Sequence, residues 1–315
     1  MRIVVLSIVA ALLAACGVLR QAQDDTQPPI GAPGVMQQSL ANATRAKRAH
    51  LPTLDVTPDR RGRRTLLYVS TLSSDTYVFT YRKGKLRSIV TTLFNATGLC
   101  SDARGDVFLS SATIYEYQHG QDVPVAELSN PFGEPLACSV DPITGRLAVV
   151  SGGGLAIYKP MTRYRWRLPR LYTPNATLAG GGYDAMGNLF VDGEDNSSKL
   201  FLAELPKGSK TFENITPDVS ITIPGAVQWD GQYLAVGDEH NSLIHRFAIS
   251  GSAATQVGSL TLSGASNIGQ FWIEQNTLIG PDISNNAVGF WHYPAGGTAV
   301  KSIPLDEPYG ATISR

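Results

Sequence analysis

The sequence predicts an all-β fold whose strands repeat about every 40 to 45 residues. Two observations support this prediction. Short runs rich in Leu, Val and Phe recur with starts 40, 40, 42, 45 and 44 residues apart, and Asp/Gly turn signals precede several of them. Beyond residue 64 no stretch has a sustained helical period. The runs are Leu67–Ser70, Val107–Ser110, Leu147–Val150, Leu189–Asp192, Leu234–Gly237 and Leu278–Pro281.

Each repeat is predicted to contain four strands in the same order. A strand of small residues, such as Gly98–Asp102, leads into a turn like Asp102–Gly105, with Asp at its first and Gly at its fourth position, as type I turns prefer. The core run follows, and then a strand with alternating side chains such as Thr113–Tyr117. A more polar segment such as Val257–Leu262 completes the repeat.

Four strands every 40 to 45 residues are the period of a β-propeller blade, so six core runs predict a six-bladed β-propeller of four-stranded blades. Tyr309–Ser314 has the composition of a first strand but no core run after it, whereas the core run at Leu67 has no first strand before it. We therefore expect the C-terminal strand to join the first blade and close the ring. Closure also removes an exposed sheet edge, which is an aggregation hazard.

This pattern resembles the six-bladed propellers of the NHL and gluconolactonase-like proteins. Gly98–Tyr117 and Gly225–Phe247 carry the resemblance most visibly, and Val236–Phe247 is close to the NHL pattern of Asp, Asn and then an apolar-x-x-Phe. In the gluconolactonase-like enzymes, one divalent cation is held in the channel by Glu, Asn and Asp. The starts of the predicted inner strands offer only Glu134 and Asn267, which is a thinner set.

Propeller ligands usually bind at the mouth of the central channel, and five residues form the candidate ligand-binding rim there: Glu134, Asp192, Asp238, Asn267 and Asp282. Their oxygens could hold a channel calcium ion. The alternative, which we favour, is that the Asp side chains form turns by accepting hydrogen bonds from loop amides. The five histidines lack metal-binding spacing and no Gly-x-Ser-x-Gly motif is present, so we expect no catalytic residue, metal ligand or cofactor.

The first residues predict export and lipidation. Arg2 precedes the apolar run Ile3–Ala15, which is too short to span a membrane but typical of a secretory signal peptide. Leu13–Cys16 resembles the lipobox of bacterial lipoproteins, in which the cysteine carries a diacylglyceryl group. We therefore expect a signal peptide at 1–15 and a lipid anchor at Cys16 in the bilayer of the cell envelope, the outer membrane if the cell is Gram-negative. A buried helix of a cytosolic protein is the alternative.

Residues 16–64 are predicted to be the lipidated cysteine and a flexible basic tether, followed by the propeller at 65–315. Gln21–Gly34 is rich in Gln, Pro, Asp and Gly without a period. Arg45–Arg64 contains seven basic and two acidic residues, which could contact anionic lipid headgroups or cell-wall polymer, or could simply keep a linker soluble. The whole chain has 26 basic and 26 acidic residues, which argues against nucleic acid as a partner.

Arg163–Tyr172 stands apart because arginines alternate with aromatic and apolar residues. Alternation places Arg163, Arg165 and Arg167 on one face and the intervening residues, including Leu168, on the other. This pattern favours an outer strand whose edge is protected by charge and which ends at Pro169. An anion or polysaccharide patch is the functional alternative.

Cys100 and Cys138 fall in the predicted first strands of consecutive repeats. An oxidising compartment permits a disulfide between them. First strands of neighbouring blades are not expected to be hydrogen-bonded to each other, and their separation could exceed the roughly 7 Å between Cα atoms that a disulfide tolerates. We therefore expect two buried free thiols, with a disulfide between the second and third blades as the alternative.

These features favour a monomeric, membrane-anchored lipoprotein whose propeller is a binding or scaffold module for a protein or a glycan. The first alternative is a divalent-metal-dependent lactonase or esterase with its site in the propeller channel. A structural envelope protein without a small ligand is the third hypothesis. The propeller fold serves many functions, so the choice depends on the site rather than on the fold.

Overall fold

The computed structural model describes residues 64–92 and 95–315. The predicted signal peptide, Cys16 and nearly all of the tether 16–64 lie outside the described residues. Within the described part every regular element is a β-strand, which confirms the all-β prediction. That part contains no helix of the length and apolar character needed to cross a membrane.

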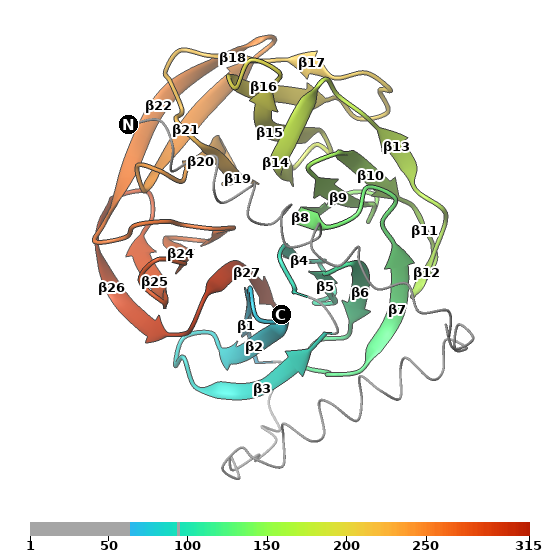
Figure 1. Ribbon diagram of the computed structural model, residues 1–315, viewed down its shortest axis with the longest axis vertical. Coiled ribbons are helices and arrows are strands. Elements are labelled where there is room, and N and C mark those ends of the chain that lie inside the picture. The colour runs from blue at the N-terminus through green and yellow to red at the C-terminus, as the bar shows by residue number, and fades with distance from the viewer. Residues whose placement is uncertain (1–63, 93–94) are drawn as a thin grey trace, which may run out of the picture. The chain divides into compact units, whose positions relative to one another are not determined.

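The strands form antiparallel sheets in which strands consecutive in the chain are mostly neighbours (Figure 1). The first sheet has the order β27-β1-β2-β3 and the second the order β4-β5-β6-β7. Their bounds are β27 Pro308–Ser314, β1 Leu66–Thr71, β2 Asp75–Thr80, β3 Leu86–Thr91, β4 Leu99–Ser101, β5 Val107–Ser110, β6 Thr113–Tyr117 and β7 Pro124–Ser129.

The third sheet has the order β8-β9-β10-β13 and the fourth the order β14-β15-β16-β17, and a separate hairpin pairs β11 with β12. Their bounds are β8 Pro135–Val140, β9 Leu147–Ser151, β10 Gly154–Tyr158, β11 Pro160–Thr162, β12 Arg165–Trp166, β13 Arg170–Tyr172, β14 Ala176–Tyr183, β15 Leu189–Asp195, β16 Leu200–Leu205 and β17 Glu213–Asn214.

The largest sheet has nine strands in the order β19-β20-β21-β22-β26-β25-β24-β23, with β18 paired to β22. Its two antiparallel halves, β19–β22 and β23–β26, meet only through a short parallel pairing of Leu262–Ser263 with Gly297–Thr298. The bounds are β18 Thr216–Pro217, β19 Pro224–Trp229, β20 Leu234–Asp238, β21 Leu243–Ser250, β22 Ala253–Ser263, β23 Trp272–Glu274, β24 Thr277–Asp282, β25 Ala287–His292 and β26 Gly296–Pro304.

The core lies between neighbouring sheets, which are arranged around a common centre (Figure 1). The predicted core runs are the second strands β1, β5, β9, β15, β20 and β24, each with side chains buried on both faces. On one face of β1, Tyr68 packs with Leu99 and Leu109 of the second sheet. On its other face, Leu67 packs with Ile279 of β24. Such continuous apolar runs are typical of strands that are covered on both sides.

The last strand of the chain completes the first sheet. β27 pairs antiparallel with β1, with Ile313 opposite Leu67 and Ala311 opposite Val69. The expectation that the C-terminal strand joins the first core run is confirmed. The segment that precedes β1 in sequence therefore supplies no described strand to this sheet.

The first strands approach one another closely at the centre. A Cβ atom on Gly269 would lie 2.2 Å from the carbonyl oxygen of Tyr309, so no larger residue fits there. Beside it, the backbone N–H of Gln270 donates to the same carbonyl at 2.8 Å. The Gln270 side chain then bonds both backbone groups of Leu99, accepting from its N–H and donating to its carbonyl, each at 2.7 Å. The Gln270 side chain therefore provides hydrogen-bond partners for Leu99 at the edge of β4, where no neighbouring strand supplies them.

Cys100 and Cys138 form a disulfide, so the expectation of two free thiols is wrong. Their Cα atoms are 5.5 Å apart, well within the range that a disulfide spans. The first strands β4 and β8 come this close because small residues face each other beside the cysteines. A Cβ atom on Gly98 would lie only 2.6 Å from the Cα atom of Ala137.

The Arg-rich stretch is not the single outer strand that the sequence predicts. Residues 160–166 form the hairpin β11–β12, which lies over the second sheet, and the outer strand of the third sheet is β13. Trp166 packs edge-on against Phe108 of β5 with ring centroids 5.5 Å apart. Arg163, Arg165 and Arg167 are exposed as expected, but Leu168 is 94% exposed rather than covered.

Replacing Ile313 with Ala tests the role of the closing strand. Ile313 is 3% exposed and packs against Leu67 and Val288, so its truncation leaves a cavity in the core. We expect the free energy of unfolding to fall by about 3 kcal/mol. Urea unfolding measures this fall. Val300→Ala, at a 57% exposed position, is the matched control and should change the free energy by less than about 0.5 kcal/mol. Equal stability of the two variants would contradict the packing described here.

The disulfide gives a second prediction. Alkylation of the denatured, unreduced protein should add no alkyl group to Cys100 or Cys138, and reduction should add two. Replacing both residues with Ser removes a link that spans 38 residues, and we expect a loss of about 3–4 kcal/mol in the free energy of unfolding. Mass spectrometry gives the first result and urea unfolding the second. Two alkyl groups without reduction would show that the bond is absent.

Candidate functional site

The three predicted rim aspartates are buried on second strands, Asp192 within β15 and Asp238 and Asp282 at the ends of β20 and β24, and each accepts from backbone amides. Asp192 Oδ1 accepts from the Gly180 N–H at 2.8 Å, and Asp238 Oδ2 accepts from the Thr222 N–H at 2.9 Å. Asp282 Oδ1 accepts from backbone amides of the segment before β23, the nearest at 3.3 Å. Gly180 lies within the first strand β14, whereas the donors to Asp238 and Asp282 lie in the segments that lead into the first strands β19 and β23. The carboxylates thus position these segments at the centre.

The other two rim candidates are placed differently. Glu134 is exposed in the segment before β8, and Asn267 is half-buried before β23. The Asn267 backbone N–H lies 3.4 Å from Asp282 Oδ1, so the structure brings these two residues together. Among residues 64–92 and 95–315, no group of three or more His, Cys, Asp or Glu side chains could hold a metal ion.

Glu239, which the sequence did not single out, follows Asp238 at the same end of the molecule. Burial raises the pKa of Glu239 to about 8, and the neighbouring charge of Asp238 adds to the shift. Burial also raises the pKa of Asp192 well above its ordinary value, and the charge of Glu239 contributes. At neutral pH the carboxyl group of Glu239 is therefore mostly protonated, and burial opposes the ionisation of Asp192. Neutral carboxyl groups are poor ligands for a calcium ion, which prefers charged oxygens.

A second buried carboxyl group lies beneath the β11–β12 hairpin. Glu116 on β6 is fully buried, and its Oε2 accepts from the Trp166 indole N–H at 2.8 Å. Burial raises its pKa to about 7; the Trp166 hydrogen bond opposes this shift, and the charge of Asp106 adds to it. Nothing in this cluster is open to a ligand, because the hairpin covers it. We interpret it as a structural contact between the second sheet and the β11–β12 hairpin.

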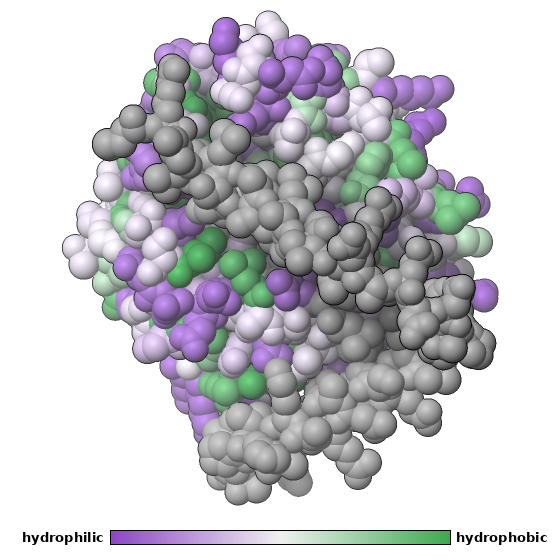
Figure 2. Space-filling view, in the orientation of Figure 1, coloured by the Kyte–Doolittle hydropathy of each residue, from purple (hydrophilic) through white to green (hydrophobic). Residues whose placement is uncertain are grey.

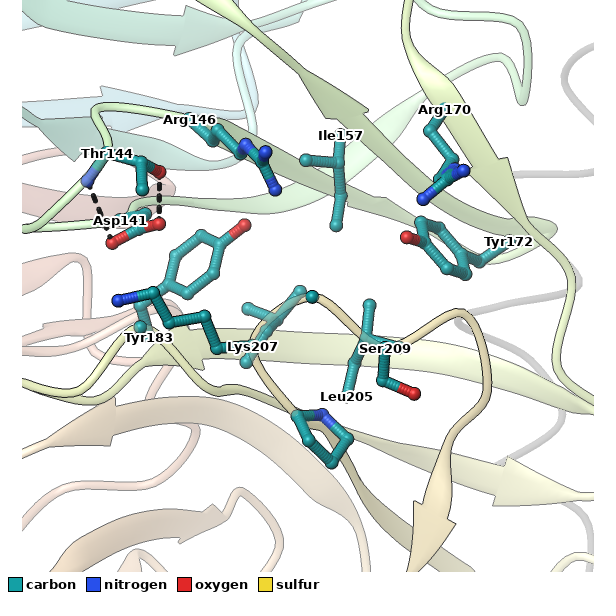
Figure 3. A pocket seen from close by; sticks show the side chains of 14 residues that line it. Asp141, Thr144, Arg146, Ile157, Arg170, Tyr172, Tyr183, Leu205, Lys207 and Ser209 are labelled. Carbon is teal, nitrogen blue, oxygen red and sulfur yellow. Dashed lines mark hydrogen bonds between the residues drawn. The ribbon is translucent and has the colours of Figure 1, made fainter.

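A pocket of about 290 Å³ opens between the third and fourth sheets (Figure 3). It lies at the turns that join first to second strands and third to fourth strands, which is the end opposite to the predicted rim. Its floor is apolar, with Leu189 and Leu205 buried and Ile157 half-buried. The lining comes from Asp141, Thr144, Arg146, Ile157, Arg170, Tyr172, Tyr183, Gly187, Leu189, Leu205, Pro206, Lys207, Gly208 and Ser209.

Three cations surround this pocket. Arg146 follows the turn before β9, Arg170 begins β13 and Lys207 follows β16, and Figure 3 shows the two arginines on the same side of the hollow. None of the three forms an ion pair with any residue that the structure describes. Burial raises the pKa of Tyr183, so its phenol stays protonated at neutral pH and can donate a hydrogen bond.

This pocket is not predictable from the sequence alone, although two of its residues lie in a stretch that stands out in the sequence. Arg170 and Tyr172 are the end of the Arg-rich stretch, for which an anion patch was the functional alternative. The other lining residues come from strand β10, from the turns β8–β9 and β14–β15 with the strand ends beside them, and from the end of β16 and the segment after it, which lie far apart in the sequence. Their proximity depends on how the third and fourth sheets pack, which no local pattern shows.

A second hollow, of about 350 Å³, lies near β18 and the start of β16. Its charged residues are Glu194 and Lys199, which have opposite signs, and most of its other lining residues are small or apolar. In the view of Figure 2 the described surface mixes hydrophilic and hydrophobic side chains without one large apolar area. The cationic pocket between the third and fourth sheets is therefore the best-defined candidate site.

No protein-family model and no curated protein matches this chain. Solved structures do. A chain of a nidogen/laminin complex is 13% identical with a TM-score of 0.63, covering 80% of this chain and 98% of that one. The Swd1 β-propeller domain of Myceliophteria thermophila is 9% identical with a TM-score of 0.55, covering 80% and 89%. A putative 6-phosphogluconolactonase of Bacteroides fragilis is 11% identical with a TM-score of 0.61, covering 82% and 100%. These likenesses show that the fold is a β-propeller.

The raised pKa of Glu116 predicts a pH dependence of stability. Between its ordinary pKa of 4.5 and about 7, the carboxyl group ionises in the unfolded chain but stays protonated in the folded protein. The free energy of unfolding should therefore decrease as pH rises through this window. Glu116→Gln should flatten the decrease by roughly 1–3 kcal/mol. Urea unfolding from pH 4.5 to 7.5 measures it. The exposed Glu127→Gln is the control, and an equal slope in both variants would refute the assignment.

Proposed function

We propose that this chain is an exported lipoprotein, anchored through Cys16, whose six-bladed propeller is a binding module for a glycan or protein ligand. The anchor is supported by the apolar run Ile3–Ala15 and the lipobox-like Leu13–Cys16. Two or three acyl chains on one cysteine give stable attachment, whereas a single chain does not. In a Gram-negative cell the anchor would place the protein in the outer membrane.

The blade count rests on how the largest sheet is built. Each half, β19–β22 and β23–β26, is a four-stranded antiparallel unit with its own second strand, like the four other sheets. The parallel contact between the halves involves only two residue pairs. Counting the halves separately gives six four-stranded units, in agreement with six core runs in the sequence. The NHL-like pattern at Val236–Phe247 falls in one of these units.

One observation carries the choice of a binding module over an enzyme. Three of the five rim residues, Asp192, Asp238 and Asp282, hold backbone amides. The cations of the pocket between the third and fourth blades have no ion-pair partner among the described residues. Charged groups without partners at a concave surface are typical of ligand recognition.

Replacing Cys16 with Ser tests the anchor. Without its thiol the protein cannot receive a diacylglyceryl group, so the variant should lose labelled fatty acid and leave the membrane fraction. Cell fractionation and radiolabelled palmitate incorporation give the two results. Ser7→Ala, inside the apolar run, is the matched control and should remain lipidated and membrane-bound. A Cys16→Ser protein that still partitions wholly with membranes would refute the anchor.

Metal content and activity separate the binding module from the lactonase alternative. The protein purified from membranes in detergent should contain no stoichiometric divalent cation by elemental analysis. It should not accelerate the hydrolysis of gluconolactone when calcium is added. One calcium per chain together with calcium-dependent hydrolysis would replace the binding module with a channel enzyme.

A further inference from the structure

We infer that the pocket between the third and fourth sheets binds a sugar that carries a carboxylate or phosphate group. This inference rests on the proposed function, because it names the ligand class of the binding module. It places the site at the end of the molecule opposite to the predicted rim. Arg146, Arg170 and Lys207 hold the anion, and Tyr172 and Tyr183 contact the sugar.

The charge of the pocket selects an anion. Three cations border a hollow of about 290 Å³, and no described acidic residue forms an ion pair with any of them. Like charges gathered around a partly enclosed space repel one another. A bound anion relieves this repulsion, and guanidinium groups match the geometry of carboxylate and phosphate oxygens.

Asp141, the acidic residue in the lining, forms no ion pair with the three cations, so the lining keeps a formal charge of +2 (3 − 1). Its carboxylate is buried and shapes the turn before β9, accepting from the Ile143 N–H at 2.8 Å and the Thr144 N–H at 3.2 Å. Its other oxygen accepts from the Thr144 hydroxyl. Figure 3 shows the two bonds between Asp141 and Thr144 at one side of the pocket, away from Arg170. The carboxylate is thus occupied within the turn.

The remaining lining favours a ligand larger than a free anion. Leu189 and Leu205 give an apolar floor, and the Tyr172 ring is held in place by an edge-on contact with Phe212 at 6.0 Å between centroids. A sugar ring has apolar C–H faces that suit such a surface and hydroxyls that suit a phenol donor. The protonated Tyr183 hydroxyl supplies that donor. The volume is near the lower end of small-molecule sites, about 300 Å³, and so fits one or two rings.

Binding of defined probes tests this inference. The full chain, purified in detergent, is titrated with trigalacturonate and glucose 1-phosphate, and with maltotriose and inorganic phosphate as comparators. Ligand-observed NMR gives the dissociation constants. We expect at least one acidic sugar to bind at least about tenfold more tightly than maltotriose and inorganic phosphate. Which of the two binds identifies the source of the anion as a carboxylate or a phosphate.

Matched variants locate the site. Arg146→Gln with Arg170→Gln should weaken acidic-sugar binding at least about tenfold, because each loses a charge-assisted hydrogen bond. Arg165→Gln with Arg167→Gln removes the same charge from exposed positions outside the pocket and should leave affinity within about twofold. Unchanged melting temperatures show that both variants fold. Equal weakening in both pairs would mean that only net charge matters and would overturn the site.

Other outcomes distinguish this inference from the proposed function. If acidic sugars bind but the Arg146/Arg170 variant binds them equally well, the site is wrong and the binding module stands. If inorganic phosphate binds as tightly as the best acidic sugar, the ligand class is wrong. If no probe binds, the inference falls; failure of a wider glycan and envelope-protein panel would then also remove the binding module.

Discussion

The close approach of the first strands at the centre is the constraint on which the rest of this molecule depends. Gly269 lies against the carbonyl of Tyr309, and Gly180 lies so close to Gly225 that a Cβ atom would be 2.1 Å from its carbonyl oxygen. Backbones this close leave no space for side chains between them. The sheets must therefore diverge outward. Larger side chains on their second and third strands fill the widening space between neighbouring sheets. The same contact brings Cys100 within bonding distance of Cys138.

This packing also decides where function can reside. Segments that enter the centre expose backbone amides, and a buried amide without a partner is costly. Asp192, Asp238 and Asp282 satisfy such amides, so these side chains have a structural role at the centre. At the outer part of the contact between the third and fourth sheets, side chains are not needed to satisfy buried backbone amides. Polar residues there, such as Arg146 and Arg170, are free to meet a ligand.

The repeat, the core strands and the closing strand could be predicted because each depends on local patterns. Leu67 begins a buried run, and the composition of Tyr309–Ser314 marks a first strand without a repeat of its own. The disulfide and the pocket could not be predicted, because both depend on distances between sheets. The Arg-rich stretch shows an intermediate case. Alternation correctly placed its arginines at the surface, but nothing local indicated that Trp166 turns back to cover Glu116 of another sheet.

Neighbouring sheets are not all held together equally strongly, and this has a mechanical consequence. The second and third sheets are joined covalently by Cys100 and Cys138 and are also clasped by Trp166. The neighbouring third and fourth sheets meet through noncovalent contacts such as the Tyr183 N–H to Ser139 Oγ bond at 3.1 Å. Under a pulling force the contact between the second and third sheets would resist, and the contact between the third and fourth sheets would separate first. A ligand bound across the contact between the third and fourth sheets would then act as a removable cross-link, stiffening the ring at a joint that has no disulfide.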